Sequence, residues 1–137
     1  MNECIFCKIV NGSLPCYKIY ESEKSLAFLD RSPVHKGHTL VIPKKHSETI
    51  IDTDEDILRD MVVATKKTSK AIYEGLKIEG FNIGINQFEA AGQVVPHLHI
   101  HIIPRYKNDG LKSWPSRAYG SEDEIRKSQE KITRLLK

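Results

Sequence analysis

The 137-residue sequence contains no long apolar run. Its apolar runs, such as Leu40 to Ile42, are far shorter than the roughly 20 residues that a membrane-spanning helix needs. The chain begins Met-Asn-Glu and shows neither the basic start nor the apolar stretch of a secretory signal peptide. We therefore expect a cytoplasmic protein that has no membrane partner.

Blocks of like charge, internal repeats and Gly/Ser-rich linkers are also absent. The 21 Lys and Arg residues are interleaved with 18 Asp and Glu residues, which leaves a formal net charge of +3. This interleaving argues against nucleic-acid binding, while the small positive excess raises the local concentration of small anions. The length suits one domain and leaves no room for a second. We expect a single globular domain that binds no nucleic acid.

Cysteine is scarce, with only Cys4, Cys7 and Cys16 present. An odd count with tight spacing fits a reduced compartment, and metal or thiol chemistry, better than a disulfide scaffold. The pair Cys4-x-x-Cys7 by itself leaves a redox role, a metal role and no role open. Cys16 has no evident partner and fits a small buried hydrophobic residue.

Stretches that favour strands outnumber those that favour helices. Strands are expected over residues 17–21, 25–30, 38–43, 81–86 and 96–104, where β-branched and apolar residues recur between turn residues. Most of the links between them are of hairpin length. These stretches predict an α+β domain with a mainly antiparallel five-stranded sheet.

A long helix is expected from Asp54 to about Glu74, because apolar positions recur there at three and four residues. Thr53 with Asp56 resembles a capping box at its start. The apolar positions are Ile57, Leu58, Met61, Val62, Thr65, Ala71 and Ile72. This pattern predicts a helix that lies on one face of the sheet.

Two shorter helices are expected at the ends of the chain. The first, a short helix or turn over residues 4–10, ends at Asn11-Gly12. Residues 107–120 contain Gly110, Pro115 and Gly120 and are typical of a loop. The sequence Ser121-x-x-Glu124 then predicts the start of a C-terminal helix.

Three histidines alternate with apolar residues in His97-Leu98-His99-Ile100-His101. On a strand this alternation places the imidazoles on one face, with successive rings about 6.6 to 6.8 Å apart. That spacing prevents hydrogen bonds between them but suits three roles around one ligand. Histidines from one strand can also bind zinc with a ligand from elsewhere, leaving a position for activated water. A metal-dependent hydrolase therefore remains an alternative.

The segment before the histidines contains residues that suit a phosphate or ribose site. Glycines 84 and 92 allow backbone N–H groups to approach a ligand closely, and Asn86 and Gln93 supply neutral hydrogen-bonding groups. Glycines and amides in a loop are more often ordinary turn residues. The segment therefore indicates a phosphate or ribose site only in combination with the histidines that follow it.

The run His97 to Ile103 resembles the His-φ-His-φ-His-φ-φ signature (φ apolar) of the histidine triad (HIT) family. The flanking residues 91–96 and 104–105, and residues 37–46, are also similar to blocks of that family. The resemblance covers roughly Cys4 to Tyr106. It implies a catalytic domain over residues 1–106, a loop and helix of the same domain over 107–137, and a homodimer.

The resemblance implies a nucleotide hydrolase or transferase that cleaves adenosine phosphoramidates or diadenosine polyphosphates at the α-phosphate. His99 would attack phosphorus and form a nucleotidyl-histidine, which a neutral imidazole can do if one nitrogen is bare and the other keeps its proton on a carbonyl. His101 and His38 would flank the phosphate and donate hydrogen bonds to it. Gln93 completes the catalytic candidates.

The resemblance also implies the contacts of an AMP-like purine nucleotide. The candidate binding residues are Asp30, Asn86, Gly92, Gln93, Val94, Ile19, Phe28 and Phe6. Asp30 would accept the ribose hydroxyls, and the last three would form a slot for the base. Val94 stands where many relatives have Ser or Thr, so only its backbone can contribute there. In the family the C-terminal segment can reach the partner's site, which makes Trp114 a candidate substrate contact.

The resemblance further implies a structural zinc ion held by Cys4, Cys7, His46 and His97. Four nitrogen and sulfur ligands make a closed tetrahedral site. Zinc on His97 would fix the segment beside His99. The second alternative for the whole chain is a non-catalytic protein of the same fold that binds purine nucleotides and regulates a partner.

Overall fold

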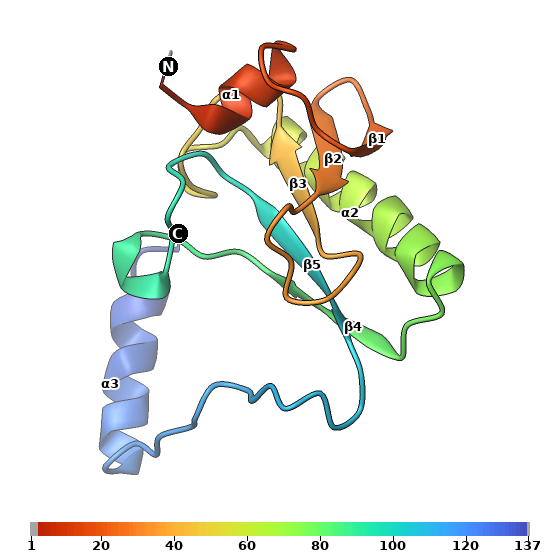
Figure 1. Cartoon of the computed structure of the whole chain (residues 1–137). Helices are drawn as coiled ribbons and strands as arrows, with labels where there is room; N and C mark the ends of the chain where they lie inside the picture. The colour runs from red at the N-terminus through yellow and green to blue at the C-terminus, as the bar shows by residue number, and fades with distance from the viewer. Residues whose placement is uncertain (1–2, 137) are drawn as a thin grey trace.

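Five antiparallel strands form the body of the structure, a computed structural model that describes residues 3–136 (Figure 1). They are β1 (Lys18–Glu21), β2 (Ser25–Leu29), β3 (Thr39–Pro43), β4 (Gly80–Gly84) and β5 (Ile100–Arg105), in the spatial order β1-β2-β3-β5-β4. β3 is the middle strand and pairs with β5, so residues far apart in sequence become neighbours, with Leu40 opposite His101. The predicted α+β fold with a five-stranded sheet is confirmed.

The helices differ in their relation to the sheet. The long α2 (Glu55–Gly75) covers one face, α1 (Ile5–Val10) lies over the opposite face, and α3 (Glu122–Thr133) stands away from the sheet (Figure 1). A short 3-10 helix, η1 (Glu89–Ala91), precedes the histidine segment. Among the described residues, no helix combines the length and the apolar character that crossing a bilayer requires.

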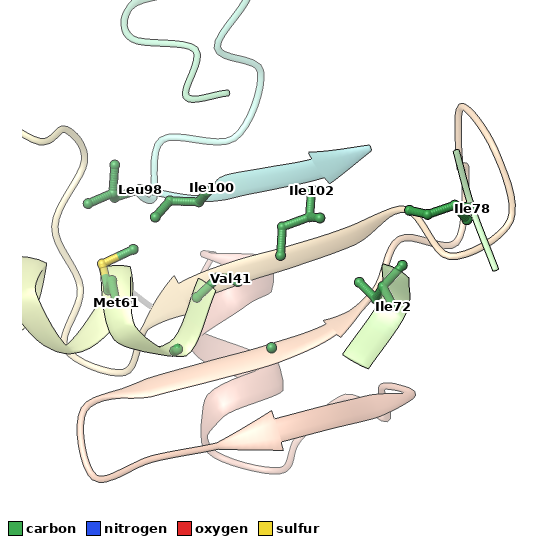
Figure 2. Close-up of a cluster of buried hydrophobic side chains, with 9 residues drawn as sticks. Val41, Met61, Ile72, Ile78, Leu98, Ile100 and Ile102 are labelled. Carbon is green, nitrogen blue, oxygen red and sulfur yellow. The ribbon is translucent and has the colours of Figure 1, made fainter. Parts of the chain in front are cut away.

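Apolar side chains on both faces of the sheet hold it between α1 and α2. Toward α2 the buried cluster contains Val41, Met61, Ile72, Ile78, Leu98, Ile100 and Ile102, together with two alanines (Figure 2). Toward α1 it contains Phe6, Leu26, Phe28, Leu40 and Ile42. Full burial of each large apolar side chain contributes about 1.5 to 3 kcal/mol. The central strand β3 is consequently buried along its whole length.

The start of α2 differs from its prediction. Asp54 is the N-cap and its side chain makes no capping bond, whereas Thr53 donates its hydroxyl to the Thr49 carbonyl oxygen at 2.6 Å. The predicted capping box of Thr53 and Asp56 is therefore wrong, because a turn before the helix engages the threonine. Val62 is 62% exposed rather than facing the sheet.

The buried face of α2 contains two short polar side chains, Thr68 and Ser69, that the apolar pattern did not include, beside the expected Thr65. Its buried residues are Met61, Ala64, Thr65, Thr68, Ser69 and Ile72. The residues are spaced three and four apart, so they form one stripe along the helix. Small side chains at these positions let the helix lie close to the sheet, while Ala71 is exposed on the outer side.

The histidine strand begins later than predicted. Ladder pairing starts at Ile100, and His97 lies before it in a bend, where its N–H donates to the Val95 carbonyl oxygen at 2.9 Å. The next residue, Leu98, donates its N–H to the Ser47 carbonyl oxygen at 2.8 Å. The alternation itself holds, because Leu98 joins Ile100 in the cluster beneath α2. The three imidazoles thus share the face opposite α2, as predicted, although only His101 belongs to the strand.

The C-terminal helix begins as predicted. Ser121 is its N-cap and accepts a hydrogen bond from the backbone N–H of Glu124 at 3.2 Å. Its apolar side, which includes Ile125 and Ile132, remains exposed. The loop over residues 106–120 connects it to β5 without a further helix or strand among these residues.

Gly37 shapes the turn that leads into β3. Its φ is +95°, and the N–H of His38 closes the turn on the His35 carbonyl oxygen at 3.0 Å. A Cβ at this position would meet Leu76 Cδ1 at 2.5 Å. The end of the leucine can move away, but the backbone conformation cannot be relieved in the same way. Gly37 is therefore required mainly for its positive φ.

We expect Gly37→Ala to lower the free energy of unfolding by about 1 to 3 kcal/mol, because an L-residue is strained at this φ. Urea denaturation of the variant and the wild type measures this difference. Gly75→Ala is the matched control, since Gly75 ends α2 with open space around it and no positive φ. Equal stability of the two variants would contradict the role given to Gly37.

Candidate functional site

His99 lies just before β5 and is buried, with 7% of its surface exposed. Its Nδ1 is 2.7 Å from the carbonyl oxygen of His97. A carbonyl only accepts, so Nδ1 carries the proton and donates it, and Nε2 of the neutral ring is left bare. The Phe6 ring meets the imidazole edge-on at 5.2 Å between centroids. This is the protonation pattern that a histidine nucleophile requires.

His38 and His101 form a hydrogen-bonded pair across the two central strands. The Nε2 of His38 is 3.0 Å from Nδ1 of His101. The backbone N–H of Val34 donates to Nδ1 of His38, also at 3.0 Å. Because Nδ1 of His38 must accept, the neutral ring carries its proton on Nε2 and donates it to His101. His101 in turn carries its proton on Nε2.

Both rings of this pair favour the neutral form. Burial, followed by the nearby His99 and His38, lowers the pKa of His101 to about 4, while the charge of Asp30 opposes the shift. Burial also lowers the pKa of His38, while the charge of Asp30 opposes that shift. The Nε2 of His101 is buried and has no hydrogen-bond partner among residues 3–136. His101 therefore has one N–H that remains to be donated.

Asp30 lies at the end of β2, beside this pair. Its Oδ2 is 3.6 Å from His38 Nε2, and its Oδ1 accepts the backbone N–H of Ser32 at 2.8 Å. The aspartate thus also has the turn-forming contact expected of a residue at a strand end. One carboxylate oxygen remains directed toward the histidines.

A cavity of about 490 Å³ opens beside the pair. Its lining includes His38, His101, Asn86 and Trp114. Trp114 stands at the rim, because 91% of its surface is exposed. The structure therefore brings the C-terminal loop of the same chain to the histidine pocket.

The amide side chain of Gln93 is engaged by the backbone around it. Its Oε1 accepts the N–H of Phe88 at 2.8 Å, and its Nε2 donates to the carbonyl oxygens of Glu48 at 2.7 Å and Val95 at 3.2 Å. Gly92 follows η1 with a φ of +89°. Val94 is 89% exposed. Gln93 thus holds this loop together, and the backbone N–H groups of Gly92 and Gln93 donate within it to the carbonyl oxygens of Glu89 and Phe88.

The three candidates for the base slot do not share one environment. Phe6 and Phe28 are buried and meet edge-on at 5.8 Å, so both belong to the core beneath α1. Ile19 is 42% exposed and lies at a bulge in β1, next to Lys18, which pairs with Phe28. Of the three, Ile19 offers the largest surface to a ligand.

Cys4, Cys7, His46 and His97 gather at the N-terminal end of α1, with one ligand atom from each within 4.8 Å of the others. Sγ of Cys4 is 3.3 Å from His97 Nδ1, Sγ of Cys7 is 3.3 Å from His46 Nδ1, and the two Nδ1 atoms are 3.1 Å apart. Ligand atoms around tetrahedral zinc are roughly 3.3 to 3.8 Å apart, given its usual bond lengths. The four side chains fit a zinc ion.

Among these four residues, His97 is prepared as a ligand by its surroundings. His97 Nε2 donates to the carbonyl oxygen of Pro43 at 3.0 Å, which leaves Nδ1 bare. Burial lowers the pKa of His97 to about 4, so the ring is neutral. Burial, followed by the contact with Cys4, raises the pKa of the Cys7 thiol. Cys16 lies outside the group and packs against the core beneath α1.

Asp30, His38 and His101 form a second group with metal-binding atoms within 4.8 Å of one another. In this group His38 Nε2 and His101 Nδ1 face each other at hydrogen-bond distance. A cation here would replace the proton between them. The hydrogen bond from Val34 places that proton in the pair, and sequence reasoning missed it because a backbone N–H leaves no signature in the residue types.

Comparison with known proteins identifies relatives along most of the chain. A family model described as the HIT domain matches residues 11–108. The adenosine 5'-monophosphoramidase hnt1 of Schizosaccharomyces pombe is 42% identical over 98% of this chain and 98% of its own. The adenylylsulfatase HINT3 of Arabidopsis thaliana is 43% identical over 84% of this chain, which spans 57% of that larger protein.

A solved structure is similar in the same region. The zinc-bound histidine triad family protein of Mycobacterium smegmatis is 36% identical and superposes with a TM-score of 0.76, over 98% of both chains.

Proposed function

The chain belongs to the HIT domain family, and from that premise we propose that it is a nucleotide hydrolase that cleaves at the α-phosphate of adenosine nucleotides through a covalent intermediate on His99. The observation that carries the proposal is the hydrogen bond from His99 Nδ1 to the His97 carbonyl oxygen at 2.7 Å. It leaves Nε2 bare on a neutral ring, which is the form that attacks phosphorus.

In the first step His99 Nε2 forms a bond to the α-phosphorus while the bond from phosphorus to the leaving group breaks. The Nε2–H of His101, supported by His38, donates to a phosphate oxygen or to the leaving group as charge develops. In the second step water attacks the nucleotidyl-histidine, and its proton returns to the Nε2 of His101 that protonated the leaving group. The bond between phosphorus and His99 Nε2 breaks, AMP departs and His99 is regenerated. The two steps need no metal ion at phosphorus.

The other candidate residues receive roles around this centre. Asp30 accepts the ribose hydroxyls, and the base lies toward Ile19, Phe28 and Phe6. Asn86 and the backbone of the loop at Gly92, Gln93 and Val94 face the phosphate, with Gln93 as the residue that holds this loop. Residues 1–106 form the catalytic domain, and residues 107–137 complete it as a loop and helix.

The relatives support a small leaving group. The fission yeast relative is named for a monophosphoramidase and the Arabidopsis relative for an adenylylsulfatase. The substrate that each name indicates joins an adenylyl group to a leaving group that is smaller than a nucleotide. A cytoplasmic homodimer with zinc held by Cys4, Cys7, His46 and His97 completes the proposal, and the zinc-bound mycobacterial relative supports the metal.

Turnover of three substrates by the wild-type protein tests this function. Adenosine phosphoramidate should be hydrolysed to AMP and ammonia with the highest kcat/KM, adenylyl sulfate next, and a diadenosine polyphosphate most slowly. Rapid acid quenching followed by intact-mass spectrometry should reveal the adenylylated chain. Absence of turnover with all three, combined with AMP binding in calorimetry, would replace this proposal with the non-catalytic nucleotide-binding protein.

A further inference from the structure

The carboxylate of Asp109, in the loop after β5, accepts hydrogen bonds from several neighbouring groups. Arg105 donates two hydrogen bonds to it, from Nε at 2.7 Å and from Nη2 at 2.9 Å. The backbone N–H groups of Tyr106 and Leu111 donate two more, at 3.2 Å and 3.0 Å. The Asp109 side chain is 6% exposed. The hydrogen bonds from Arg105 hold the pKa of Asp109 far below its usual range. The group is therefore a charged, nearly buried carboxylate.

Arg105 anchors this carboxylate to the histidine strand. It lies four residues after His101 in β5, and residues at even spacing share one face of a strand. Its Nη1 also donates to Asn82 Oδ1 at 2.6 Å, across to β4. The position of Asp109 is thus set by the two strands that line the histidine pocket.

The remaining contact of Asp109 leads to the loop before β3. Its Oδ2 is 3.3 Å from Nε2 of His35, and the His35 ring meets Tyr106 edge-on at 5.3 Å. The carbonyl oxygen of His35 accepts the N–H of His38, and the preceding residue, Val34, donates to His38 Nδ1. His35 therefore belongs to the turn that determines where His38 carries its proton.

We infer that Asp109 is a positioning residue, which through His35 holds the loop of residues 31–37 so that Val34 keeps His38, and hence His101, protonated on Nε2. The series of contacts from Arg105 through Asp109 and His35 to Val34 is called the Asp109 tether below. If the loop moves, Nδ1 of His38 is free to carry the proton, and Nε2 then no longer donates to His101. The kinetic consequence rests on the proposed function, whereas the protonation pattern does not.

Asp109→Asn tests the tether, because it keeps the size of the side chain and removes its charge. Ring nitrogen shifts in 15N NMR distinguish a protonated from a bare nitrogen. In the wild type we expect His38 and His101 to carry their proton on Nε2 alone. In the variant we expect each ring to exchange between the form protonated on Nε2 and the form protonated on Nδ1. With adenosine phosphoramidate, kcat should fall about 10- to 100-fold while KM changes less than about twofold, since small displacements of catalytic groups have effects of that size.

Matched variants separate positioning from loss of folding. Asp123→Asn removes the same charge from another aspartate paired with a basic residue four positions away, Lys127 in α3 at 3.0 Å, and should alter neither readout. His35→Gln retains a side-chain N–H for Asp109 and should keep most of kcat. His35→Ala should behave as Asp109→Asn does. Thermal unfolding of each variant is measured alongside.

Two results would overturn the inference. One is a 15N NMR result in which His38 and His101 stay protonated on Nε2 alone in both Asp109→Asn and His35→Ala. The other is equal kcat for His35→Ala and wild type. If the wild type hydrolyses no substrate, the proposed function fails, and the NMR comparison still decides whether the tether sets the protonation of His38.

Discussion

His99→Gly is expected to lower kcat for adenosine phosphoramidate by at least about 10³-fold, as removal of a covalent nucleophile does in other enzymes. In the structure Nδ1 of this residue is tied to the His97 carbonyl oxygen at 2.7 Å, which leaves Nε2 as the bare nitrogen of the neutral ring. Glycine leaves the neighbouring hydrogen bond between His38 and His101 in place, so the loss should reside in kcat. Steady-state release of AMP measures it.

Two further results are expected for this variant. The adenylylated species trapped in the wild type should be absent, and imidazole added to the buffer should restore part of the turnover by occupying the place of the missing ring. Circular dichroism and thermal unfolding establish that the variant is folded, which matters because His99 is buried against Phe6. Wild-type turnover in His99→Gly would refute the covalent mechanism.

Cys7→Ser is expected to lower the zinc content of the purified protein from about one ion per chain to a small fraction, because the hydroxyl is a weak ligand where the thiolate was a strong one. The melting temperature should fall by roughly 10 °C or more, since loss of a structural metal is among the most destabilising single changes. Metal analysis and differential scanning calorimetry measure the two effects.

Cys16→Ser is the matched control for the zinc site. It makes the same chemical change at a cysteine that packs on the same core but lies outside the four-residue cluster. It should retain zinc and lose only a few degrees of melting temperature. Below its melting temperature Cys7→Ser should still turn over substrate. Loss of turnover on chelation, without loss of stability, would instead favour the metal-dependent hydrolase.

Several elements of the fold were predictable because their signals are local. The alternation of histidines with apolar residues places Leu98, Ile100 and Ile102 in the cluster beneath α2, as the period of an extended chain requires. Ser121 with Glu124 marked the start of α3. The capping box at Thr53 failed because the hydroxyl found a closer acceptor in a preceding turn, which no spacing rule reveals.

The sequence by itself determined which chemical groups this protein has and how they recur along the chain: the alternating histidines, the cysteine pair and the resemblance that connects them with His46. The tertiary structure alone decided the protonation of those histidines, because the atoms responsible are backbone groups of His97, Val34 and Pro43. Every residue has such groups, so the residue types do not reveal which of them are paired. The partners of His99 and His38 lie two and four residues away, on a backbone conformation that the fold sets, and the partner of His97 lies 54 residues away. The Asp109 tether likewise forms only when β5 and the loop before β3 lie together.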